Sequence, residues 1–209
     1  MAIQTTAPGK RRAALQMGDV VIVRGAVGDA AKLAEFAART FADTFASDNN
    51  PEDLQTHLET NYGIEQQSAE LTDPNVTTVL ARLDGALMAY AQVRQSAPPP
   101  CVTHASPIEL HRFYVDRKAH GTGLASSLML EVHRAVHEFG GRHIWLGVWE
   151  RNARAMAFYR KARFVDVGSQ FYMVGPDKQV DRVLVATVSL ESPDRMAVQR
   201  MHAKTQPPE

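Results

Sequence analysis

A single stretch decides the fold of this chain: Ile108-Glu-Leu-His-Arg-Phe-Tyr-Val115, followed at once by Asp116-Arg-Lys-Ala-His-Gly-Thr-Gly123. Its first half is rich in β-branched and aromatic residues and predicts a buried strand. Side chains alternate between the two faces of a regular strand. That alternation would place Glu109, His111, Phe113 and Val115 on one face of the strand, and Leu110, Arg112 and Tyr114 on the other.

Beyond Gly123, apolar residues recur at helical spacing as far as Gly140-Gly141, which predicts a helix that begins just after the two glycines. The first N–H groups of a helix lack internal partners, and the helix dipole adds about half a positive charge there. Such a helix start favours a bound phosphate. A simple tight turn would explain Gly121 and Gly123 equally well, so this motif alone leaves both interpretations open.

The second half of the chain supplies another strand and helix. His143-Ile-Trp-Leu-Gly-Val-Trp149 predicts a buried strand, and Asn152 is a natural N-cap for the helix that follows it. The motifs Lys118-Ala-His-Gly-Thr-Gly123 and Asn152-x-x-Ala-x-x-Phe-Tyr-x-Lys161 together resemble the acetyl-CoA-binding core of the Gcn5-related N-acetyltransferase (GNAT) superfamily. The resemblance covers most of the chain.

Shorter motifs look like those of the bacterial polyamine (spermidine/spermine) acetyltransferase branch: Phe41-Ala-Asp-Thr-Phe45, Asn50-Pro-Glu-Asp-Leu54, Ile144-Trp-Leu-Gly-Val-Trp-Glu150 and Phe171-Tyr-Met173. Two residues depart from the superfamily pattern. Lys118 stands where Arg or Gln is usual, which keeps a cation near the phosphates. Arg163 stands where a Gly usually precedes the aromatic residue that opens the next strand, which alters a turn.

The order of the predicted elements is helices, a hairpin around Asp84-Gly85, strand-helix-strand-helix, and two closing strands, Phe164 to Val174 and Val180 to Leu190. This order predicts a mixed α+β fold with helices on both faces of one sheet. The resemblance implies a twisted, mostly antiparallel sheet of about seven strands. It also implies a splayed parallel pair of strands that holds the pantetheine arm of CoA.

The resemblance also implies which residues bind acetyl-CoA, the expected co-substrate. Backbone groups of three strand residues would pair with pantetheine, and the glycine loop, helped by two cationic side chains, would hold the phosphates. Asn152 would contact the cofactor or only cap its helix. The expected cofactor-binding residues are Phe113, Tyr114, Val115, Lys118, His120, Gly121, Thr122, Gly123, Leu124, Ala125 and Asn152.

Direct acetyl transfer to an amine needs a base for the amine and an acid for the leaving thiolate. Tyr159 occupies the position where a tyrosine of this superfamily commonly protonates the thiolate, although core packing would also explain it. Glu109 and His111 could deprotonate the amine, directly or through water. Both could equally be hydrogen-bonded residues beside solvent or a loop.

Acidic residues near the first two predicted helices, Asp43, Asp48, Glu52 and Asp53, could attract a cationic acceptor, although the last two also suit a first helical turn. Cys101 has only His104 as a candidate base, which makes covalent catalysis a minor alternative. The eight histidines lack ligand spacing, so no metal site is predicted.

Composition predicts one domain from residue 19 to residue 190, with polar tails at 1–18 and 191–209. Lys plus Arg and Asp plus Glu both number 23, so the formal charge gives no argument for nucleic acid or an anionic membrane as a partner. One cysteine and no signal peptide favour a cytoplasmic protein. In this superfamily a dimer partner often completes a polar cleft, so a homodimer is an open alternative.

These features favour an enzyme that acetylates a primary amine on a small, polyamine-like acceptor with acetyl-CoA. Three alternatives are weighed against it. The acceptor could be a protein N-terminus or lysine, or the chain could be an acyl-CoA-binding regulatory module without catalysis. A nucleotide-binding protein is weaker, because the lysine that ends a GxxxxGK loop is missing.

Overall fold

The protein, described here by a computed structural model over residues 20–174 and 177–190, contains one seven-stranded sheet. Its strand order is β1-β2-β3-β4-β5-β7-β6, and every neighbouring pair is antiparallel except β4 and β5. The strands are β1 Val20–Arg24, β2 Val76–Leu83, β3 Ala86–Arg94, β4 Pro107–Val115, β5 His143–Trp149, β6 Val165–Val174 and β7 Asp177–Thr187.

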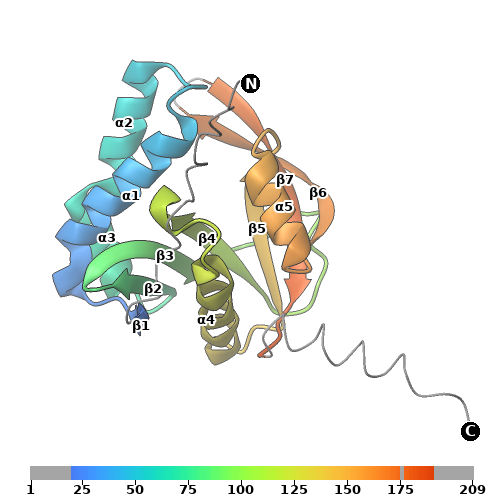
Figure 1. Ribbon diagram of the computed structural model, residues 1–209. Helices are drawn as coiled ribbons and strands as arrows, with labels where there is room; N and C mark the ends of the chain where they lie inside the picture. The colour runs from blue at the N-terminus through green and yellow to red at the C-terminus, as the bar shows by residue number, and fades with distance from the viewer. Residues whose placement is uncertain (1–19, 175–176, 191–209) are drawn as a thin grey trace, which may run out of the picture.

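Helices cover both faces of this sheet, as Figure 1 shows. One group packs on Leu80 and Tyr90 of the sheet, and the other packs on the opposite face around Leu128, Ile144 and Leu146. The first group is α1 Ala30–Phe45, α2 Pro51–Tyr62 and α3 Ile64–Thr72, and the second is α4 Leu124–Glu138 and α5 Ala153–Lys161. Two short 3-10 helices, η1 Val27–Asp29 and η2 Arg117–Ala119, complete the elements. The predicted mixed fold is confirmed.

The parallel strands β4 and β5 pair over only three positions before they separate. Pro107, Ile108 and Glu109 lie opposite His143, Ile144 and Trp145, and no later residue of β4 pairs with β5. Figure 1 shows the two strands diverging toward α1. Beyond Glu109, one edge of β4 therefore has backbone groups without strand partners, as the resemblance implied.

A β-bulge at His111 changes the side-chain pattern of β4. Gln92 pairs with Arg112 and Val93 pairs with Leu110, so His111 is an extra residue between two pairs. An extra residue in one strand reverses the faces of all residues that follow it.

The predicted alternation of β4 is wrong beyond His111 for this reason. Phe113 and Val115 pack with Ile108 and Leu110 in the core under α4, not on the face of Glu109. Arg112 and Tyr114 turn instead toward α1, α2 and α3, where Arg112 binds Glu70 and Tyr114 packs on the aromatic core.

The local signals of the sequence are largely confirmed. The Asn50 side chain accepts a hydrogen bond from the Glu52 amide at 2.8 Å and caps α2, and Asp84-Gly85 makes the turn between β2 and β3. Arg163 takes a positive φ of 71°, the conformation that the usual glycine would favour. The last strand begins at Asp177 and ends at Thr187, earlier than the predicted Val180 to Leu190.

The two predicted tails, residues 1–18 and 191–209, lie outside the described residues. Among the helices that the structure does describe, none has the length and apolarity needed to cross a bilayer.

Candidate active site

A cavity of about 720 Å³ opens where β4 and β5 separate. Its walls come from α1, the end of α2, the end of β3, β4, the loop after β4, the start of α4, α5, and β5 to β7. Of the residues predicted to act on substrate or cofactor, Glu109, His111, Phe113, Tyr114, Val115, His120, Gly121, Gly123, Ala125, Asn152 and Tyr159 line it.

The start of α4 presents unpaired backbone N–H groups to this cavity. Gly121 and Gly123 have positive φ angles of 81° and 91°, which glycine adopts without strain. The Leu124 amide donates to Thr122 Oγ1, whereas the amides of Gly121, Gly123 and Ala125 find no acceptor among the described residues. Free amides at a helix start fit a phosphate group.

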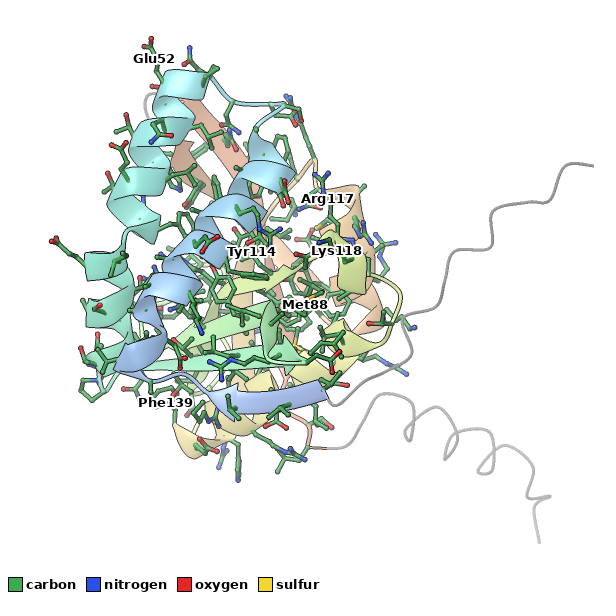
Figure 2. The ribbon with its side chains drawn as sticks, turned by 60° about the vertical axis from the view of Figure 1, so that its left-hand side comes forward. Glu52, Met88, Tyr114, Arg117, Lys118 and Phe139 are labelled. Atoms are coloured by element: carbon green, nitrogen blue, oxygen red, sulfur yellow. The ribbon has the colours of Figure 1, made fainter. Side chains whose placement is uncertain are left out.

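Two contacts from α1 hold the loop that precedes α4. Asp116 accepts hydrogen bonds from the Lys118 amide at 2.9 Å and from Arg39 of α1 at 2.7 Å. Burial alone would raise the pKa of Asp116, but these hydrogen bonds outweigh it and lower the pKa. Arg117 donates to the Asp43 carbonyl of α1. In Figure 2, Arg117 and Lys118 lie close to each other, next to α1.

Three of the predicted cofactor residues do not line the cavity. Lys118 is exposed, the Leu124 side chain is buried under the sheet, and the Thr122 hydroxyl donates to Ala119 O at 2.7 Å. His120 does line it, and its ring nitrogen Nε2 lies 3.0 Å from Val115 O. Burial, and next the nearby charge of Arg154, lower the pKa of His120.

Glu109 is a buried carboxylate with three side-chain partners. Arg94 Nε donates to it at 2.5 Å, Ser96 Oγ donates at 2.6 Å, and His111 Nδ1 lies 3.4 Å from Oε1. Burial would raise the pKa of Glu109, but the hydrogen bonds from His111, Arg94 and Ser96 prevail and hold the pKa at about 2. Glu109 is therefore an anion at every ordinary pH, and it is too weakly basic to take a proton from an amine.

The bulge residue His111 lies beside Glu109, at the point where β4 and β5 separate. A carboxylate only accepts hydrogen bonds, so a contact between Glu109 and His111 Nδ1 places the proton on Nδ1 and leaves Nε2 as an acceptor. Burial is the main cause that lowers the pKa of His111, against the opposing effect of Glu109. The imidazole is consequently neutral at neutral pH.

The ring of Tyr159 belongs to the core, while the residue also lines the cavity. It packs edge-on against Phe113, Phe158 and Phe164, with ring centroids 6.3, 5.4 and 5.3 Å away. None of the hydrogen bonds between the described residues involves its hydroxyl. Burial raises the pKa of Tyr159, so the phenol keeps its proton.

Asn152 caps α5 as predicted, because its Oδ1 accepts a hydrogen bond from the Ala155 amide at 3.0 Å. The same residue lines the cavity. Its amide nitrogen is left to contact a ligand, so capping and cofactor binding are compatible.

The acidic residues near the first helices are not gathered at the cavity. Asp43 lines it and lies 3.6 Å from Arg39, whereas Asp48, Glu52 and Asp53 are not part of its walls. Glu52 projects from the outer end of α2 (Figure 2). Glu52 and Asp53 stand in the first turn of α2, where acidic side chains are favourable to the helix dipole.

Cys101 lies outside the cavity, against Gly168 and in the small core around Trp145. His104 packs instead on His143, with ring centroids 4.9 Å apart. In the described part of the chain, no group of three or more His, Cys, Asp or Glu side chains is placed to hold a metal ion.

Residues 37–164 match the model of the Acetyltransferase (GNAT) family. The chain belongs to this family. An uncharacterized N-acetyltransferase of Mycobacterium tuberculosis is 32% identical over 157 residues, which are 75% of this chain and 96% of the relative. Another, of Lactobacillus delbrueckii subsp. lactis, is 27% identical over 168 residues, or 80% of this chain and 97% of that one. The protein is an acetyl-CoA-dependent N-acetyltransferase of the GNAT type.

Solved structures share the fold of this GNAT protein. The PaiA N-acetyltransferase from Thermoplasma acidophilum, crystallised with coenzyme A, has a TM-score of 0.64 at 18% identity, covering 81% of this chain and 99% of its own. A Salmonella typhimurium protein with acetyl-CoA, described as a putative acetyltransferase, has a TM-score of 0.58 at 14% identity. The match covers 82% of this chain and 95% of that one.

Several cavity residues of this GNAT protein, among them Arg154 and Asp181, were not singled out by the sequence analysis. Arg154, the second residue of α5, lines the cavity, and its charge contributes with burial to the lowered pKa of His120. Its position in the first turn after Asn152 could have indicated a phosphate contact. Asp181 lies in β7 between Val180 and the charged Arg182, and this local sequence does not distinguish it from a surface residue of a strand.

Proposed function

We propose that this enzyme transfers the acetyl group of acetyl-CoA directly to a primary amine of a small acceptor, of which a polyamine is the type that the sequence motifs favour. The observation that carries the proposal is the cleft between β4 and β5, which His111 and Tyr159 both line. Acetyl-CoA supplies the activated acyl carbon and a thiolate leaving group. The remaining steps fall to side chains of this chain.

The cofactor would lie along the free edge of β4 and end at the start of α4. The backbone of Phe113, Tyr114 and Val115 would pair with the pantetheine amides. The free amides of Gly121, Gly123 and Ala125, with His120 and Arg154 beside them, would hold the phosphates. Lys118 and Thr122 would contribute at the outer rim, and Leu124 only through its place in the helix.

His111 would take the proton of the attacking amine. Its Nε2 is the free acceptor, and the Glu109 carboxylate fixes the other nitrogen, so the two residues act as one unit. As the amine nitrogen bonds to the acetyl carbon, the carbon–sulfur bond breaks and the electron pair leaves on sulfur. A positive charge that develops on His111 is stabilised by Glu109.

Tyr159 would donate its hydroxyl proton toward the departing sulfur. A phenol that is buried, protonated and outside the hydrogen bonds of the described residues is suited to this role. The products are then a free thiol and an amide. Solvent carries the proton from His111 back to Tyr159, which restores both residues for the next turnover.

A small acceptor is supported by the contact between α2 and β6 at the acceptor end. His57 Nε2 of α2 lies 3.4 Å from the Tyr172 hydroxyl of β6, so α2 and β6 meet beside the part of the cavity that Tyr172 lines. A protein N-terminus or lysine would need an open groove. A cytoplasmic location and a homodimer stay predictions.

Release of CoA thiol, measured with a panel of mono-, di- and polyamines and one lysine peptide, tests the proposal. We expect turnover with small amines and a mass increase of one acetyl group in the product. Turnover with the peptide alone would contradict the small acceptor. Acetyl-CoA binding without turnover on any amine would support the non-catalytic alternative.

A further inference from the structure

Asp181 of β7 is a carboxylate that the proposed mechanism does not use. Only 9% of the residue is exposed, and it lines the cavity. In the described part of the chain it makes no hydrogen bond and no ion pair. A buried carboxylate without a partner is costly, so its retention calls for a function.

The other carboxylates of the cavity wall already have cationic partners. Glu109 is bound by Arg94, and Asp43 lies beside Arg39. Of the acidic residues that line the cavity, Asp181 alone lacks a cation within the described structure. A cation that enters the cavity therefore gains most at Asp181.

The surrounding strands give Asp181 room to face the cavity. Gly147 of β5 lies next to it, and a Cβ added at Gly147 would stand 3.0 Å from Asp181 Oδ2 and 2.7 Å from Gln170 Nε2. Both distances are tighter than ordinary contacts. The absence of a side chain at Gly147 thus leaves space for the Asp181 carboxylate beside β5.

The neighbours of Asp181 are suited to an alkyl chain that carries a charge. Trp149 pairs directly with Asp181 across β5 and β7, so their side chains share a face. Phe45 packs against Trp149 with ring centroids 5.8 Å apart, and Tyr172 also lines this part of the cavity. Aromatic faces attract methylene groups and cations alike.

We propose that Asp181 binds a second, non-reacting ammonium group of the acceptor. A nitrogen held in an ion pair stays protonated and cannot attack the thioester, so the reacting amine must be a different one, beside His111. This inference rests on the proposed function and narrows its substrate class to acceptors with two cationic groups. Burial raises the pKa of Asp181 to about 6, and an ammonium partner would bring it down.

Two acceptors and two variants test this assignment. The acceptors are 1,4-diaminobutane and 1-aminobutane, which share a carbon chain and differ in one amino group. Asp181→Asn removes the charge and keeps the shape. The matched control is Asp166→Asn, which alters an exposed carboxylate on β6 that pairs with Arg182 outside the cavity.

We expect the wild-type enzyme to prefer the diamine, and Asp181→Asn to lower kcat/KM for the diamine at least about tenfold, through KM. Activity on the monoamine and all activities of Asp166→Asn should stay within about twofold. An equal loss on both amines would mean that Asp181 acts on the reacting nitrogen, which overturns the proposal. The absence of a diamine preference in the wild type would overturn it too.

A binding measurement separates this inference from the proposed function. Calorimetric titration of 1,4-diaminobutane into the full-length protein with CoA bound should show binding that weakens at least about tenfold in Asp181→Asn. Binding that depends on Asp181 without any acetylation would refute the proposed acceptor and keep the cation site. Acetylation that is unchanged in Asp181→Asn, with unchanged binding, would refute the cation site alone.

Discussion

The two walls of the cleft are built in different ways. The wall proposed for the cofactor, residues 113–125, is one stretch of the chain, and it would offer mainly backbone N–H and C=O groups. The wall proposed for the acceptor takes side chains from several strands, with Glu109 and His111 on β4, Tyr172 on β6 and Asp181 on β7. On this proposal, backbone groups bind the cofactor, which is common to the fold, whereas side chains select the acceptor, which differs between enzymes of one fold.

Within the acceptor wall, two buried carboxylates stand in opposite environments. Glu109 has Arg94, Ser96 and His111 as partners, and its pKa is held at about 2. Burial raises the pKa of Asp181 to about 6, because no partner offsets the loss of water. A satisfied carboxylate orients its neighbour, while an unsatisfied one is available to a ligand.

The largest expected effect comes from Tyr159, which belongs to both the core and the cleft. Tyr159→Phe keeps the ring packing and removes only the hydroxyl, so turnover should fall about 10²-fold while acetyl-CoA affinity barely changes. Thiol release at saturating acetyl-CoA, measured beside thermal unfolding, checks this. Unchanged turnover with a stability loss of about 1 kcal/mol would assign Tyr159 to packing alone.

A second variant removes the proposed general base, His111. His111→Ala should lower kcat/KM at least about tenfold near pH 7, and the deficit should shrink as the pH approaches about 10, where a free alkylamine is abundant. Glu109→Gln should lower the rate less, because the imidazole remains but loses its anionic partner. Rate profiles from pH 6 to 10 give both answers, and profiles parallel to the wild type would exclude the pair as base.

The cofactor wall should respond to a backbone change. Valine is strained at the positive φ of 91° that Gly123 adopts, so Gly123→Val should turn the amides at the start of α4 away and weaken acetyl-CoA binding about tenfold. Leu124→Met, in the same helix turn with a buried side chain, is the control. Calorimetry that finds normal affinity in a folded Gly123→Val protein would contradict the phosphate assignment.

The smallest expected effect is a pH-dependent change in stability, which tests whether Asp181, unlike Glu109, is a buried carboxylate without a partner. An aspartate whose folded pKa of about 6 exceeds its unfolded value of about 3.9 costs no stability below pH 4, and its cost is complete above about pH 6. Relative to wild type, Asp181→Asn should therefore gain about 1–2 kcal/mol between pH 4 and pH 8, allowing for solvent in the cavity. Thermal unfolding at both pH values measures the gain.

A constant difference between Asp181→Asn and wild type across that pH range would mean that Asp181 is ordinarily solvated. Burial chiefly raises the pKa of Tyr172, which shares this part of the cavity with Asp181, and the charge of Asp181 adds to the rise, so Tyr172 stays neutral between pH 4 and pH 8. His57, whose Nε2 lies 3.4 Å from the Tyr172 hydroxyl, and His111 of the same cavity are present in both proteins, so the comparison with wild type removes their own titration.

The local structure of the wall proposed for the cofactor could be predicted from the sequence, and that of much of the wall proposed for the acceptor could not. A strand, two glycines and a helix are local signals, and Gly121, Gly123 and Asn152 stand where they indicated. Asp181 depends on burial by strands that are remote in the sequence, which no local pattern encodes. The face of Phe113 was predicted wrongly because a bulge leaves no mark in the alternation of residue types.

That bulge determines which kinds of genetic change the strand β4 can survive. Replacement of His111 removes one side chain and keeps the count of residues, so the following segment still sends Phe113 and Val115 inward. Loss of the His111 codon would remove the extra residue and keep Leu110 opposite Val93 and Arg112 opposite Gln92, so the later residues would stay on their present faces. Loss of the Phe113 codon would instead shift the count, which would turn Tyr114 toward the core under α4 and Val115 toward α1. Strand β4 can therefore change its length at the bulge but not beyond it.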